Sequence, residues 1–220
     1  MNPRSLPIIK TIVLFLPLLT LSIFSKAQFE QKITLQASAG YVEVLSPKLF
    51  KEDLFDRGFS IDAGMQYNFS RSFSFAALAK YSRLFNPAKN EGIWDDEYNL
   101  IGLTICPKYR LLPRYKVNPY LYGGISINYV SLMWEKRDAE GTFDNIKNPF
   151  TLGINGGLGI DIIVNDNLSL FIQGGVLTTK YSVPEYSQLA QEYWNENWDW
   201  INFTYFQAGI NISLFKSKSL

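Results

Sequence analysis

Four charged residues, Asp62, Lys80, Lys108 and Asp161, recur on the polar side of stretches in which apolar residues alternate with polar ones. Side chains of alternate residues in an extended chain point to the same face, so we expect all four on one face. If that face lines an interior, the charges must be paired to be tolerated. The pattern therefore predicts a lumenal ion-pair network that acts as a plug. The competing function, a proton or ion path, is disfavoured because small barrels are filled by side chains.

Residue types that carry acid–base or nucleophilic chemistry are scarce. Histidine is absent, which removes the commonest general base and metal ligand. The single cysteine, Cys106, lies on the polar side of its stretch, which favours a buried, inert thiol over a nucleophile. Glycines are dense between Gly153 and Gly159, but no Lys-Ser or Lys-Thr follows, so this is no phosphate loop. We expect no enzyme, no catalytic residue, no cofactor and no metal.

One aromatic segment has the composition of a binding surface. Ser182-Val183-Pro184-Glu185 fits a capping box, which predicts a short helix with Tyr186, Leu189 and Tyr193 on one face. Three tryptophans follow. The candidate extracellular binding surface, for stacking on a glycan or anchoring a protein partner, comprises Tyr186, Tyr193, Trp194, Trp198 and Trp200. The alternative is that these rings form a membrane-interface girdle, with no ligand.

Strands must position all of these residues. In the clearest run, from Phe59 to Phe69, apolar residues occupy every second position. The same period predicts eight strands, at about 32–45, 58–69, 72–83, 98–112, 117–133, 148–164, 168–180 and 200–214. Eight amphipathic strands can close into one barrel.

The connections between these strands alternate in length. Short ones lie around Ser70-Arg71, at 112–116 and at 165–167, whereas long ones lie at 46–57, 84–97, 134–147 and 181–199. The long loops carry 7 basic and 15 acidic residues, while the short turns with Arg110, Lys216 and Lys218 carry 6 basic and 1 acidic. Short turns at one end and long loops at the other are typical of an outer-membrane barrel.

A soluble lipocalin-like barrel would alternate equally well, with its faces reversed. The polar face is mostly small, however, whereas a surface in water is usually rich in Lys and Glu. Aromatic residues gather near the expected rims: Phe59, Phe69, Phe73, Tyr81, Tyr98, Tyr109, Tyr129, Phe150 and Trp200. We therefore expect an all-β, eight-stranded antiparallel up-and-down transmembrane β-barrel with short periplasmic turns and long extracellular loops.

The first 27 residues are typical of a secretory signal peptide. Arg4 and Lys10 supply positive charge before the apolar stretch from Thr11 to Phe24. Ser25-Lys26-Ala27 then offers small residues at the cleavage positions. We expect residues 1–27 to be removed and residues 28–220 to form the barrel domain. That domain has 18 basic and 20 acidic residues, and this near-neutral balance indicates no nucleic-acid partner.

Three stretches resemble the PorT-type outer-membrane β-barrel family of Bacteroidota. They are Asn99 to Leu111, Val117 to Ile125 and Gly156 to Asp161, with placed Gly, Pro and Tyr residues. The resemblance implies an eight-stranded outer-membrane barrel whose family includes a member linked to assembly of a protein-secretion system. The last strand, from Gln207 to Leu214, also resembles the C-terminal signal that barrel-assembly machinery recognises.

These observations predict a small, non-enzymatic outer-membrane barrel. It would act in binding, scaffolding, or envelope or secretion assembly through its extracellular loops. Its expected partners are outer-membrane lipid, the barrel-assembly machinery during biogenesis, and a glycan or protein partner at the loops. Two alternatives remain open, a soluble lipocalin-like periplasmic or secreted carrier of an apolar ligand and a narrow channel.

Overall fold

The computed structural model describes residues 33–46, 55–85, 97–136, 142–165, 167–180 and 200–214. Eight strands make up nearly all of this: β1 (Ile33–Ser46), β2 (Arg57–Asn68), β3 (Phe73–Phe85), β4 (Glu97–Arg110), β5 (Val117–Lys136), β6 (Thr142–Ile163), β7 (Leu168–Lys180) and β8 (Trp200–Ser213). Their bounds confirm the eight predicted strands. The predicted leader, the predicted helix and the aromatic residues Tyr186, Tyr193, Trp194 and Trp198 lie outside the described residues.

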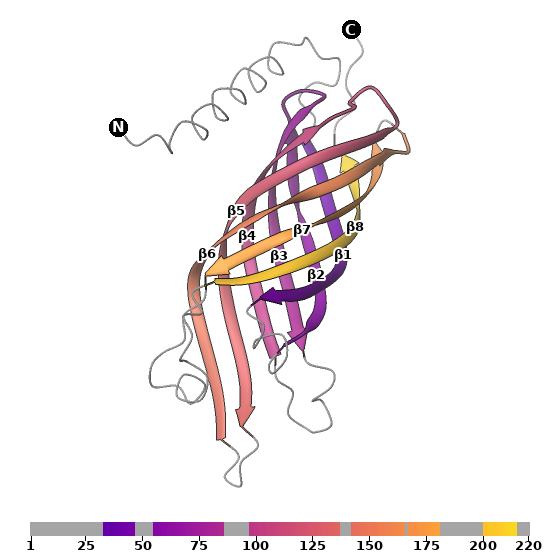
Figure 1. The fold of residues 1–220 in the computed structure, drawn as a ribbon. Coiled ribbons are helices and arrows are strands. Elements are labelled where there is room, and N and C mark those ends of the chain that lie inside the picture. Colours follow the sequence, from indigo (N-terminus) through magenta and orange to yellow (C-terminus); the bar gives the residue numbers. More distant parts are fainter. Residues whose placement is uncertain are drawn as a thin grey trace, which may run out of the picture.

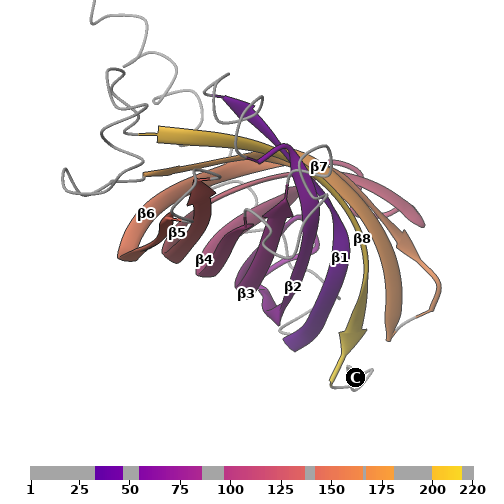
Figure 2. The same ribbon diagram turned by 90° about the horizontal axis from the view of Figure 1, so that it is seen from below.

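Each strand pairs antiparallel with the next one along the chain, and β8 pairs with β1 to close the barrel. Figure 1 shows the tilted strands from the side, and Figure 2 shows them from the end that carries the long connections. Closure leaves the barrel without a free sheet edge, as a lipid environment requires. Among the described residues, no helix is long and apolar enough to cross a membrane.

The two faces of the strands differ as their period of two predicts. On β3, the buried residues Ser74, Ala76, Leu78 and Lys80 alternate with outward ones. The outer face exposes large apolar side chains around the wall, including Leu35, Ile61, Met65, Ile101, Leu103, Ile125, Ile127, Leu152, Ile154, Leu158, Leu170 and Ile172. An apolar band facing outward suits lipid rather than water.

The prediction of a long loop at 134–147 is wrong. β5 and β6 stay paired from Val130 and Asn148 out to Lys136 and Thr142, and this two-stranded ribbon projects beyond the other strands (Figure 1). The apolar period that reveals strands comes from having one face in lipid. Because a ribbon beyond the membrane lacks that face, its sequence of mixed charges concealed the strands.

The ribbon leaves the barrel wall at an irregularity. The register of β5 with β6 shifts between Asn128 and Val130, and on β6 Phe150 has a φ of 59°. A positive φ is uncommon for a bulky residue and marks a sharp local bend. Phe150 itself is 83% exposed, on the outer side where an aromatic girdle was predicted.

Tyr98 corrects the predicted girdle. It was expected to face lipid at the rim, but its side chain is fully buried inside the barrel. Tyr98 shares the parity of Leu100 and Thr104, which are also buried, so alternation along β4 places it inside. The prediction of a rim position rested on the aromatic character of Tyr98 and did not use its parity.

Candidate functional site: the lumen and its open end

The strongest cluster of charge in the lumen joins β4 to β6. Asp161 accepts from Lys108 Nζ through Oδ1 at 2.9 Å and from Arg110 Nε through Oδ2 at 2.9 Å. Asn211 Nδ2 lies 3.5 Å from the same Oδ1. Lys108 and Asp161 are buried, so two cations surround one enclosed carboxylate.

Arg110 is the member of this cluster that sequence reasoning missed. Its position near a short turn had placed it among the charges of the turn end. The signal was present, since Arg110 shares the parity of Lys108 on β4.

The other two predicted charges form a separate pair. Asp62 and Lys80 are register partners on β2 and β3, and Lys80 Nζ lies 3.8 Å from Asp62 Oδ2. Gln207 Nε2 donates to the same oxygen at 3.0 Å, and Ser60 Oγ lies 3.4 Å from Oδ1. The structure thus places all four predicted residues in the lumen, but as two clusters.

Neutral side chains connect the two clusters. Tyr120 donates to Gln173 Oε1 at 3.0 Å, and Gln173 Nε2 donates to Gln207 Oε1 at 2.8 Å. Lys108 Nζ lies 3.6 Å from the centroid of the Tyr120 ring, a cation–π distance. The cavity among these residues has about 20 Å³, which is room for about one water molecule.

An apolar layer closes the lumen at the long-loop end. Its core is Phe55, Tyr98 and Phe203, whose ring centroids lie 5.9 Å (Phe55 to Tyr98) and 5.5 Å (Tyr98 to Phe203) apart. We call this layer the apolar seal; its members are nearly or fully buried and comprise Val42, Val44, Phe55, Leu84, Tyr98, Leu100, Val130, Ile201 and Phe203. Phe55 precedes β2 in the chain. The next residue, Asp56, is bonded to the end of β3, because its amide donates to the Phe85 carbonyl at 3.4 Å.

Sequence reasoning missed the apolar seal. Its signal lies in the inward residues of each strand, which change from polar to apolar toward the long loops. On β3 the inward series ends with Lys80, Ser82 and Leu84, and on β8 it runs from Gln207 through Tyr205 to Phe203.

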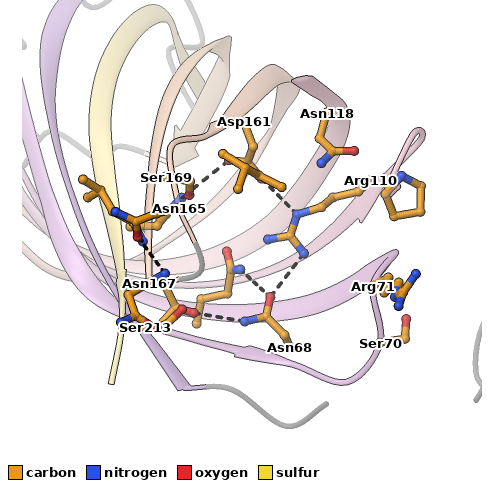
Figure 3. Close-up of a pocket in the computed structure, with 16 residues that line it drawn as sticks. Asn68, Ser70, Arg71, Arg110, Asn118, Asp161, Asn165, Asn167, Ser169 and Ser213 are labelled. Atoms are coloured by element: carbon orange, nitrogen blue, oxygen red, sulfur yellow. Dashed lines mark hydrogen bonds and ion pairs between the residues drawn. The ribbon is translucent and has the colours of Figure 1, made fainter. Parts of the chain in front are cut away.

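The opposite end of the lumen is open. A cavity of about 130 Å³ lies there, lined mostly by polar residues from several strands and from the turns between them (Figure 3). We call it the turn-end cavity; it is lined by Thr34, Gln66, Asn68, Ser70, Arg71, Arg110, Pro113, Asn118, Asp161, Ile163, Asn165, Asn167, Leu168, Ser169, Asn211 and Ser213. The lumen is therefore asymmetric, with an apolar seal at one end and a polar opening at the other.

Two further predicted features can be placed. Cys106 is a buried free thiol on β4, on the lumen side. Trp200 begins β8 and is 45% exposed, the one member of the candidate aromatic surface within the described part of the chain. Within that part, His, Cys, Asp and Glu form no group of three that could hold a metal ion.

Residues 11–213 match a known family, described as the outer membrane protein beta-barrel domain. The chain belongs to this family. With the closed barrel and the apolar outer band, this makes it a small outer-membrane β-barrel protein, and the alternative of a soluble lipocalin-like carrier is wrong.

The chain is similar to solved structures of outer-membrane proteins at low sequence identity. A major outer membrane protein from Thermus thermophilus is 12% identical, with a TM-score of 0.53 over 84% of this chain and 99% of that one. Neisserial surface protein A is 18% identical, with a TM-score of 0.49 over 83% and 97%. Ail, the attachment invasion locus protein of Yersinia pestis, solved in complex with the heparin analogue sucrose octasulfate, is 14% identical, with a TM-score of 0.44 over 84% and 99%. No curated protein matches the chain.

Proposed function

We propose that this protein is a non-enzymatic scaffold of the outer membrane that binds a glycan or protein partner through its extracellular loops. The observation that carries this proposal is the closed lumen. The apolar seal and the polar network between Asp62 and Asp161 leave too little space for a solute. Because the wall faces lipid and a solute cannot cross the lumen, the two ends of the barrel remain for partners, and the long connections offer the larger surface.

The sequence of the loop between β7 and β8 supports this assignment. In sequence, this loop contains Tyr186, Tyr193, Trp194 and Trp198, and it is followed by Trp200, which is exposed at the start of β8. Aromatic side chains offer large, rigid contact areas and stack on sugar rings. The four predicted long connections have a net charge of −8, which would favour a cationic or uncharged partner over an anionic one.

We further propose a PorT-type role in envelope or secretion assembly, on the strength of the sequence resemblance described above. In this proposal, residues 1–27 direct export and are removed. Barrel-assembly machinery then inserts residues 28–220, with Gln207 to Leu214 of the last strand as its recognition segment.

A pair of tryptophan variants tests the loop proposal. The folded protein in mild detergent is applied to a glycan array and, separately, cross-linked to outer-membrane proteins. We expect Trp194→Ala with Trp198→Ala to weaken binding at least about tenfold, as loss of interface hot spots does. The heat-dependent gel shift of a folded barrel should be unchanged.

Trp134→Ala is the matched control, because it removes a tryptophan from the ribbon of β5 and β6 at the same end. It should leave binding unchanged. If the double variant binds as well as the wild type, the rings belong to the membrane girdle and the loop proposal fails.

A further inference from the structure

The turn-end cavity has the charge, the donors and the access of a ligand site. We propose that it binds a compact oxyanion, a carboxylate or phosphate group presented from the periplasm, with Arg110 as its principal ligand. This inference is independent of the proposed loop function, because the cavity lies at the opposite end of the barrel from the long connections.

Arg110 is held in place and keeps donors to spare. Its Nε donates to Asp161 Oδ2 at 2.9 Å, and one Nη donates to Asn68 Oδ1 at 3.2 Å. These bonds fix the plane of the guanidinium, which reaches into the space between Asp161 and Asn68 in Figure 3. A guanidinium carries five N–H donors, and these two bonds leave the others for a ligand. The side chain is 15% exposed, so it is accessible from the cavity.

The side-chain acceptors of Asp161, Asn68 and Asn165 in this wall are already occupied by other groups of the protein. Both oxygens of Asp161 accept from Lys108 or Arg110, and Asn68 Oδ1 accepts from Gln66 Nε2 at 2.8 Å as well as from Arg110. Asn165 Oδ1 accepts from the amides of Asn167 and Leu168 at 2.9 Å each. Around Arg110, a ligand would therefore meet unused N–H donors beside occupied acceptors, and this arrangement favours a ligand that accepts hydrogen bonds.

Three further amide oxygens do not alter this balance. Those of Gln66, Asn118 and Asn211 have no partner, but they are covered by neighbouring atoms and have almost no surface toward the cavity. They stabilise neither an anion nor a cation placed in the open space.

The charge of the lining also favours an anion. Among the described residues that line the cavity, Arg71 and Arg110 are the cations and Asp161 is the carboxylate, and Lys108 behind the wall pairs with that carboxylate too. Arg114 is exposed in a turn at the same end, and Lys116 follows it. Arginine binds carboxylates and phosphates through paired, charge-assisted hydrogen bonds, which are stronger than neutral ones.

The size and access of the cavity limit the ligand. About 130 Å³ is close to the roughly 150 Å³ that holds one benzene, so a phosphate or carboxylate group fits with a few waters. The apolar seal blocks the lumen from the other end. A ligand must therefore enter from the short turns, which face the periplasm in outer-membrane barrels.

Calorimetric titration of the full-length barrel, folded in a non-ionic detergent, tests this site. The probes are inorganic phosphate, glycerol phosphate and acetate, with chloride used to hold ionic strength constant. We expect saturable binding of at least one probe. Preference for inorganic phosphate points to a free ion, preference for glycerol phosphate to a lipid headgroup, and preference for acetate to a peptide carboxylate. Any of these preferences supports the oxyanion site.

Three Arg→Gln variants locate the binding. We expect Arg110→Gln to weaken it at least tenfold and Arg71→Gln to weaken it less. Arg114→Gln removes an equal charge from the same end but does not line the cavity, so it should change affinity less than twofold. The heat-dependent gel shift verifies folding, and Arg71→Gln still tests the site if Arg110→Gln does not fold. No saturable binding, or an equal loss in the Arg71 and Arg114 variants, would overturn the proposal.

Discussion

Lys108 and Asp161 meet at 2.9 Å across the lumen although they stand on β4 and β6, two strands that do not pair with each other. Their contact spans β5, and the Tyr120 ring of that strand lies 3.6 Å from the same ammonium nitrogen. Three consecutive strands are thus joined on their inner face by one charged side chain. Contacts of this kind fix how the wall closes, in addition to the backbone ladder.

We expect Asp161→Asn to lower the free energy of unfolding by about 3–5 kcal/mol, the usual cost of breaking a buried ion pair. The substitution leaves Lys108 and Arg110 enclosed without their carboxylate. Urea unfolding of the barrel in lipid vesicles, followed by tryptophan fluorescence, measures the change.

Asp56→Asn is the control for this substitution. Asp56 pairs with Arg57 at 3.2 Å, but both side chains are partly exposed to solvent. Such pairs contribute about 0–1 kcal/mol, so this variant should be nearly as stable as the wild type. Equal costs at both positions would show that the lumenal charges are not enclosed.

We expect Phe203→Ala to cost about 3–5 kcal/mol, because it opens a cavity in the apolar seal. Phe206, three residues further along β8, faces outward and is 59% exposed, whereas Phe203 is 1% exposed. Lipid fills the space left by Phe206→Ala, so that variant loses only the transfer term of about 1.5–3 kcal/mol. The same unfolding measurement compares them, and a larger cost at Phe206 would contradict the placement of the seal.

We expect Gly159→Ala to cost about 1–3 kcal/mol through overpacking. A Cβ on Gly159 would clash with the hydroxyl end of the ring of Tyr120, its buried register partner on the neighbouring strand. At Gly123 the nearest atom to an added Cβ is 3.6 Å away, so Gly123→Ala should be neutral or slightly stabilising. Combining Gly159→Ala with Tyr120→Leu should cost less than the sum of the two single changes; additive costs would argue against contact.

The strands were predictable because contact with the bilayer constrains which residue types can occupy their outward positions. Every outward residue between the rims must tolerate lipid, so the period of two persists through β2, β3 and β4 without interruption. The same parity placed Asp62, Lys80, Lys108 and Asp161 on one face. Parity does not give the stagger of one strand on the next, so it could not say that Asp62 pairs with Lys80 while Asp161 pairs with Lys108 and Arg110.

Other features escaped prediction for reasons of environment. The ribbon of β5 and β6 lies beyond the wall, where no lipid face imposes alternation. The apolar seal includes Tyr98, whose aromatic type suggested the rim although its parity placed it inside, and Leu84, which was expected in the loop at 84–97. The turn-end cavity draws on residues from every part of the chain, from Thr34 to Ser213, and only closure of the barrel brings them together.

We expect the full-length protein to produce no reproducible conductance steps in planar bilayers. An ion crossing the barrel would have to pass the apolar seal, where the rings of Tyr98 and Phe203 pack at 5.5 Å between centroids and the other side chains are hydrocarbon, so little there can replace its hydration shell. It would then meet the network around Lys80 and Lys108, where the free space holds about one water. Recordings with protein-free detergent set the background. Steps that scale with protein concentration would mean that the seal opens, and the narrow-channel alternative would replace the scaffold proposal.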